Sequence, residues 1–111
     1  MNSGGFPFLG SGENMAKGLW AVRSGRFVGW QVGDNLYDAS GENVGYFDGD
    51  IAFSTSTGRY IGELYQGDWI GKRAGLSRST HASRVKTVRA SYGRQANRVG
   101  QALGGWEDPD F

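Results

Sequence analysis

The sequence predicts an all-β domain built from tandem short hairpins, and three observations support this. Glycines recur in three registers at spacings of 16 to 18 residues. Fixed turn residues flank the recurring glycines, and the segments between the turns are rich in the β-branched and aromatic residues that favour strands. The recurring glycines are predicted to be structural turn or strand positions: Gly25, Gly41 and Gly58; Gly29, Gly45 and Gly62; Gly33, Gly49 and Gly67.

Each repeat unit contains two predicted turns. The first turn places Ser or Thr before glycine, as in Ser24-Gly25, and glycine admits a positive φ at little steric cost. The second turn is a Gly-Asp pair, as in Gly33-Asp34. This pair suits a two-residue hairpin of type II′, or of type I′ because Asp tolerates a left-handed conformation.

Seven short strands follow from these turns, at residues 19–23, 26–32, 35–38, 43–47, 51–54, 59–65 and 69–72. Gly29, Gly45 and Gly62 lie inside alternate strands, where a missing side chain normally weakens a strand. Their recurrence predicts close packing around a common axis or a bend that curls the sheet. Because single hairpins cannot bury a face alone, we expect a closed or nearly closed ring of hairpins.

The pattern G-x-x-[VI]-G followed by Gly-Asp, in three tandem copies after a partial copy at residues 18–24, resembles the bacterial four-fold β-flower domain. The resemblance spans residues 18–74. It implies hairpins arranged radially in a pseudo-four-fold ring with an apolar centre, and no established reaction. The segment from Tyr60 to Gly67 also resembles a MORN repeat, but those repeats are longer and only this unit carries the glutamate.

The charge distribution divides the chain into three predicted parts. Residues 1–16 form a flexible leader, and residues 17–75 form the repeated β-hairpin domain. Residues 18–75 contain five Lys or Arg and seven Asp or Glu, a balance of −2, whereas residues 76–98 contain six Lys or Arg and no acid. In the basic tail, 76–111, the apolar spacing predicts one or two short helices ending at Gly104-Gly105. The acidic and aromatic terminus docks on the β domain or serves as a linear motif.

Composition excludes several classes of site. The chain has no cysteine, which excludes disulfides, zinc-thiolate centres and thiol nucleophiles. No segment is apolar and long enough to be a transmembrane helix or a secretion signal, so we expect a soluble cytoplasmic protein.

No catalytic or metal-binding constellation is evident, so we predict a non-enzymatic protein without a cofactor. Asp34, Asp50 and Asp68 share one repeat position and would form a ring of carboxylates, but turn chemistry already explains Asp after glycine. His81 lacks an orienting acid nearby in the sequence, and we expect it to be solvated. The Gly10–Gly12 segment with Lys17 lacks the spacing and the preceding strand of a phosphate loop.

The sequence therefore favours a small module that binds a protein partner or an apolar or lipid ligand. The candidate ligand-binding residues are aromatic, and such residues either form the core or line a cavity: Trp20, Trp30, Tyr46, Tyr60 and Trp69. The alternative is an anionic-surface binder, for nucleic acid or an acidic membrane, through six tail cations: Arg78, Arg84, Lys86, Arg89, Arg94 and Arg98. These cations equally serve to neutralise the acidic β domain. If the ring is not fully closed, its exposed sheet edges would favour self-association.

Overall fold

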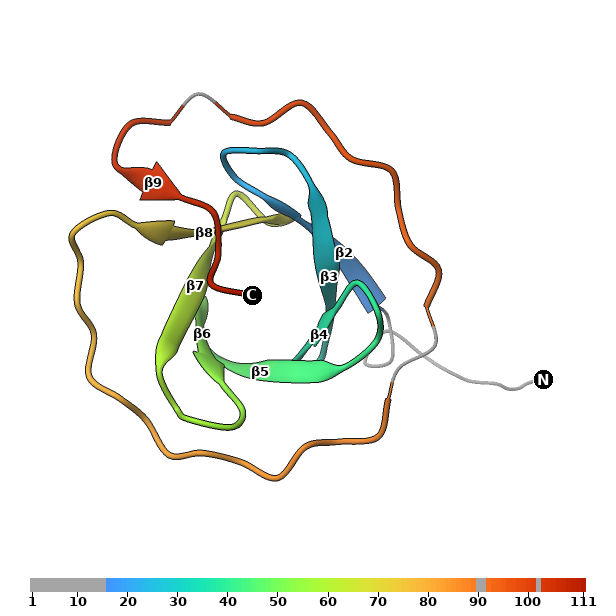
Figure 1. Cartoon of the computed structure of the whole chain (residues 1–111), viewed down its shortest axis with the longest axis vertical. Helices are drawn as coiled ribbons and strands as arrows, with labels where there is room; N and C mark the ends of the chain where they lie inside the picture. The colour runs from blue at the N-terminus through green and yellow to red at the C-terminus, as the bar shows by residue number, and fades with distance from the viewer. Residues whose placement is uncertain (1–15, 90–91, 102) are drawn as a thin grey trace.

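The computed structural model describes residues 16–89, 92–101 and 103–111, and its centre is a closed barrel of seven strands (Figure 1). The predicted leader falls almost wholly outside these residues, and the first strand begins three residues earlier than predicted. The other predicted strands lie within one residue of their observed ends. The barrel strands are β2 (Ala16–Ala21), β3 (Phe27–Val32), β4 (Asn35–Asp38), β5 (Asn43–Asp48), β6 (Ile51–Ser54), β7 (Tyr60–Tyr65) and β8 (Trp69–Arg73).

Each strand pairs antiparallel with the next along the chain, and the ring closes where β2 pairs parallel with β8. Trp20 pairs with Trp69 and Ala21 with Ile70 at this closure. Closing the sheet removes the free strand edges that would otherwise invite self-association. The predicted closed ring of hairpins is confirmed. A short strand, β9 (Trp106–Glu107), extends the sheet beyond the ring by pairing with the end of β8.

A β-bulge recurs at the same position in three strands. In β3, Gly29 pairs with Leu19 and Phe27 with Trp20, so Val28 has no partner in the ladder. Val44 and Ile61 are bulged in the same way before Gly45 and Gly62. A bulge bends and twists its strand. The glycine after it allows close approach, because a Cβ on Gly29 would overlap the carbonyl oxygen of Tyr37. The three bulges therefore supply the predicted curl.

The hairpin loops follow the predicted chemistry at two of three places. Gly33 and Gly49 have φ of 59° and 65°, whereas the Asp after each does not have a positive φ. A positive φ at the first loop residue alone is the pattern of type II′, not type I′. The third loop was predicted to have two residues but has three, Gln66 to Asp68, between the paired residues Tyr65 and Trp69. Both Gln66 and Gly67 have a positive φ.

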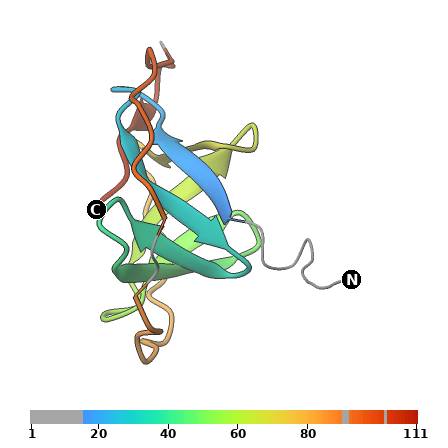
Figure 2. The same cartoon turned by 90° about the vertical axis from the view of Figure 1, so that its right-hand side faces the viewer.

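The barrel interior is filled by aliphatic side chains and one phenylalanine. Successive side chains along a strand point to opposite faces, and those on the inward face form the interior cluster. Phe111 packs against this cluster, and the chain end lies over the middle of the ring (Figures 1 and 2). The predicted apolar centre is therefore a packed core. The interior cluster consists of Leu19, Ala21, Val28, Leu36, Phe47, Ala52, Ile61 and Ile70.

The prediction of short helices in the tail is wrong. Residues 76–89 and 92–101, hereafter the belt, run as an extended chain around the outside of the barrel (Figure 1). Among the described residues, no backbone hydrogen bond joins two residues of 77–101, whereas the amides of four of them donate to barrel carbonyls: His81, Arg84, Arg98 and Gln101. Gly104 and Gly105 form a turn into β9 instead of ending a helix. The described part of the chain contains no helix long and apolar enough to cross a membrane.

Candidate functional site

The outward faces of the barrel strands carry a ring of aromatic side chains, hereafter the girdle. The girdle lies beneath the belt and includes all five residues predicted to bind a ligand. Phe27 packs edge-on against both Trp20 and Trp30, with ring centroids 5.4 Å apart in each case. Phe47, by contrast, lies in the interior cluster. The girdle consists of Trp20, Phe27, Trp30, Tyr37, Tyr46, Phe53, Tyr60 and Trp69.

The belt is held by backbone hydrogen bonds that repeat along the barrel. The amide of His81 donates to the carbonyl oxygen of Gly58 at 2.7 Å. Three residues later in the belt and three earlier in the barrel, the amide of Arg84 donates to Thr55 at 2.7 Å. We call this pair of acceptors the first clamp.

A second clamp has the same spacing. The amide of Arg98 donates to Gly25 at 2.6 Å, and the amide of Gln101 donates to Val22 at 2.7 Å. Gly25 occupies the same repeat position as Gly58, two barrel repeats earlier in the sequence, and the two clamps bind belt residues 17 apart, His81 and Arg98. The main chain of the belt therefore makes the same hydrogen bonds at two turns that occupy equivalent positions in the barrel repeat.

Glycine is required at both clamps for two reasons. Gly25 and Gly58 have φ of 77° and 76°, a region that side chains disfavour. In addition, a Cβ on Gly58 would overlap the carbonyl of His81, and a Cβ on Gly25 would overlap that of Arg98. These turn glycines, predicted from local conformation alone, also create the space in which the belt lies.

Cationic side chains of the belt stack on girdle rings. The guanidinium of Arg84 lies 3.6 Å from the ring centroid of Tyr46, and that of Arg98 lies 3.5 Å from the ring centroid of Trp20. The His81 ring stacks on Phe53 with centroids 3.7 Å apart. The His81 side chain nevertheless stays 39% exposed, so it remains solvated on the side away from Phe53, as expected.

Polar tips of the girdle also contact the belt. The indole Nε1 of Trp20 donates to the carbonyl of Ala96 at 2.8 Å, and the hydroxyl of Tyr46 donates to Ala82 at 2.6 Å. An aromatic side chain thus offers the belt both an apolar face and a hydrogen bond.

Acidic side chains of the barrel pair with four of the belt cations. Glu63 is buried and accepts from Arg78 at 3.2 Å, and Asp68 accepts from Arg98 at 2.9 Å. Glu42 pairs with Lys86 at 3.0 Å and also with Arg89. The hydrogen bond and charge of Lys86, followed by the charge of Arg89, lower the pKa of Glu42 below its ordinary 4.5.

Five of the six predicted anion-binding cations therefore contact the barrel. The exception among the described contacts is Arg94, which lines a hollow of about 260 Å³ with Arg26 and Phe111. The acidic barrel and the basic belt neutralise each other, which was one of the alternatives.

The three aspartates that were predicted to form a ring of carboxylates lie in the hairpin loops, and their main chain stabilises those loops. The backbone carbonyls of Asp34, Asp50 and Asp68 accept equivalent hydrogen bonds from neighbouring strands at 2.7, 2.8 and 3.0 Å. Asp34 and Asp50 are exposed, and Asp68 pairs with the belt. Within the described ranges, no group of three or more acidic or His residues is arranged to hold a metal ion.

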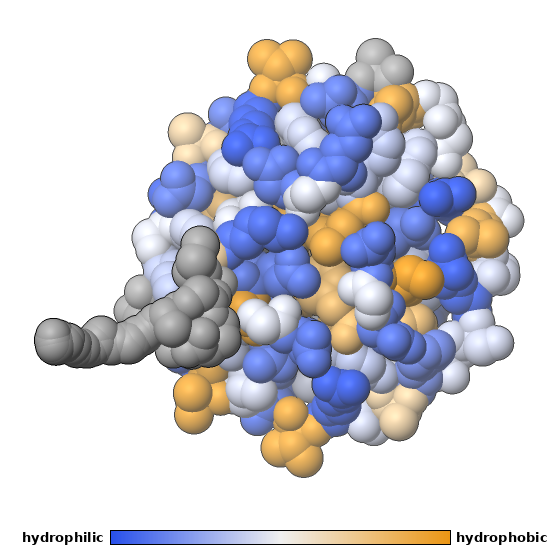
Figure 3. All heavy atoms as spheres, turned by 180° about the vertical axis from the view of Figure 1, so that it is seen from behind, coloured by the Kyte–Doolittle hydropathy of each residue, from blue (hydrophilic) through white to orange (hydrophobic). Residues whose placement is uncertain are grey.

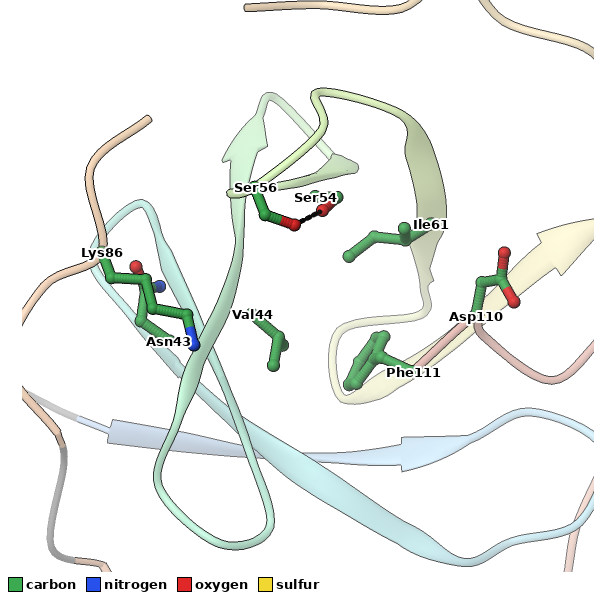
Figure 4. Close-up of a pocket in the computed structure, with 8 residues that line it drawn as sticks. All are labelled: Asn43, Val44, Ser54, Ser56, Ile61, Lys86, Asp110 and Phe111. Carbon is green, nitrogen blue, oxygen red and sulfur yellow. Dashed lines mark hydrogen bonds between the residues drawn. The ribbon is translucent and has the colours of Figure 1, made fainter. Parts of the chain in front are cut away.

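A hollow of about 230 Å³ opens at one end of the barrel beside Phe111 (Figure 4). The side chains of Phe111, Val44 and Ile61 converge there, and the hydroxyls of Ser54 and Ser56 lie 3.1 Å apart. Phe111 packs on the interior cluster, and its carbonyl accepts a hydrogen bond from Arg26 at 3.0 Å. The aromatic terminus therefore docks on the β domain.

The barrel carbonyls of the clamps were not predicted as binding groups. A backbone acceptor leaves no trace in residue type, so the residue types of the barrel did not point to them. In addition, the tail was expected to be helical, and helical amides would need no acceptors on the barrel.

A closed ring of hairpins around a packed apolar centre is the architecture that the resemblance to the four-fold β-flower domain implied. A sequence profile of the 4-fold beta flower protein family matches residues 22–102, which is 81 of the 111 residues. The chain belongs to this family, and the match includes β3 to β8 and the belt. Searches of curated proteins and of solved structures return no match.

Proposed function

We propose that this β-flower protein is a non-enzymatic module that binds other proteins, and that its binding element is the outer wall of the barrel. The observation that carries the proposal is the belt itself. The wall already holds an extended polypeptide through two pairs of carbonyl acceptors and a set of aromatic rings. Recognition of an extended chain by backbone hydrogen bonds and side-chain pockets is a general mode of peptide binding.

The barrel centre supports a lipid ligand less well. Leu19, Leu36 and Ile70 are fully buried there, and Phe111 packs across one end. A barrel whose interior is filled by its own side chains leaves no room for an acyl chain. A cytoplasmic location remains part of this proposal, since a cysteine-free chain does not depend on an oxidising compartment.

The anionic-surface alternative has weaker support, because most cations of the belt are already paired. An anionic polymer would have to compete with Glu42, Glu63 and Asp68 for the same side chains. The outer margin of the molecule instead carries nearly fully exposed valines, Val85, Val88 and Val99, and apolar side chains protrude at this margin in Figure 3.

The test compares the full-length chain with the variant Arg84→Ala/Arg98→Ala, which weakens the belt and leaves the wall intact. Both are immobilised, exposed to host lysate, and eluted with a synthetic peptide of residues 77–101. We expect proteins that are enriched on the variant and released by the peptide. Retention of lipid or nucleic acid alone, or of proteins that the peptide does not release, would contradict the proposal.

A further inference from the structure

We propose that the girdle is a receptor site for an extended, arginine-bearing segment of a partner protein, for which the belt is the built-in competitor. This inference rests on the proposed function and adds the chemistry of the ligand. It is argued from the backbone clamps, the guanidinium stacking and the charge of the barrel.

The clamps fix the path of the ligand but not its sequence. The carbonyls of Gly58 and Thr55 accept amides that are three residues apart, as do those of Gly25 and Val22. Every residue except proline offers such an amide. A contact period of three matches a polyproline II chain, which has three residues per turn and no internal hydrogen bonds. The site therefore selects an extended conformation.

Arginine is selected by the rings. The Arg98 guanidinium lies 3.5 Å from the ring centroid of Trp20 and also donates to Asp68 at 2.9 Å. A planar guanidinium can stack on a ring and donate hydrogen bonds in its plane at the same time, whereas an ammonium group cannot. The Arg84 guanidinium stacks on Tyr46 in the same way, 3.6 Å from the ring centroid.

The charge of the barrel favours a cationic ligand. Residues 18–75 carry a balance of −2, and three of their carboxylates, from Glu42, Glu63 and Asp68, contact belt cations directly. A segment rich in Asp or Glu would meet like charge at each of these positions. The partner is therefore basic as well as extended.

The belt competes because it is tethered. A short tether gives the second binding event an effective concentration on the order of mM. If the belt were released about 1% of the time, the apparent affinity for a partner would fall about 100-fold. Weakening the belt without altering the wall should therefore increase binding of a ligand added in trans.

The experiment measures fluorescence anisotropy with a labelled peptide of residues 77–101 and four full-length chains. These are the unmodified chain, Arg84→Ala/Arg98→Ala, the control Val85→Ala/Val88→Ala, and Gly58→Ala. The control alters belt side chains that are 92% and 87% exposed. Gly58→Ala frees the belt but fills the first clamp. We expect the Arg double variant to bind at least ten-fold more tightly than the other three.

A second peptide carries Lys at positions 84 and 98 and should bind at least ten-fold more weakly than the first. Equal binding of both peptides would overturn the selection of arginine but leave the proposed function standing. Binding of neither peptide, with trypsin cleavage demonstrating a free belt, would overturn both proposals. Binding of phosphatidylserine vesicles in place of either peptide would assign the girdle to a membrane and overturn them as well.

Discussion

Gly58→Ala should release the belt by removing the space in which it lies. The new Cβ would overlap the carbonyl of His81, so the first clamp cannot close. Two backbone hydrogen bonds are then lost, each worth about 1 kcal/mol net. The sum, about 2 kcal/mol, corresponds to a roughly 30-fold larger population of released belt.

Limited trypsin digestion measures this population, since cleavage follows the open fraction when reclosing is fast. Arg84, Lys86 and Arg89 are the target sites in the belt. Gly49→Ala is the matched control, because Gly49 has a φ of 65° but nothing within 4 Å of the added Cβ. Both variants should lose about 1 kcal/mol from the positive φ. Only Gly58→Ala should accelerate cleavage in the belt, and equal cleavage in both variants would refute the clamp.

Three further predictions concern other contacts. Arg98→Lys should cost about 1 kcal/mol of belt affinity, because stacking on Trp20 is lost while the charge is kept, and equal proteolysis of this variant would contradict the stacking. Phe111→Ala should destabilise the barrel by about 2 kcal/mol and lower Tm by roughly 10 °C, whereas an unchanged Tm would mean that Phe111 does not seal the core. Because the pKa of Glu42 is lowered, its contribution to the stability of the docked belt is complete above about pH 4.5 and is lost as pH falls through the depressed pKa. The amide of Thr87, which donates to Oδ1 of Asn43 at 3.1 Å, lies next in the chain to Lys86 and reports this loss. Its protection, corrected for intrinsic exchange, should fall over that range, and Glu42→Gln should abolish the change.

The strands were predictable because each strand lies between two turns, and each turn contains a glycine next to a small polar or acidic residue. The faces of the strands were not predictable from the same residues. A strand with one solvent-exposed face alternates apolar and polar residues, but here the belt buries the outer face of the strands as well. Leu36 and Tyr37 are both buried, on opposite sides of β4, and nothing in their types assigns one to the interior and the other to the girdle.

The belt was missed because its apolar spacing imitates a helix. Val85 and Val88 fall three apart, as on one face of a helix, yet both point away from the barrel. The barrel offers aligned carbonyls and rings to an extended chain, and these contacts replace the internal hydrogen bonds of a helix. Gly100 would weaken a helix, but here it permits close contact with the barrel, because a Cβ at this position would overlap the carbonyl of Arg23.

Site-resolved amide hydrogen exchange by NMR tests the central claim, that the barrel wall holds the belt as an extended ligand. The account predicts protection at His81, Arg84, Arg98 and Gln101, whose amides donate to the barrel, and rapid exchange at intervening positions such as Val85. Contiguous protection across these residues would indicate a helix. Uniformly rapid exchange would indicate an undocked tail, and either result would contradict the account.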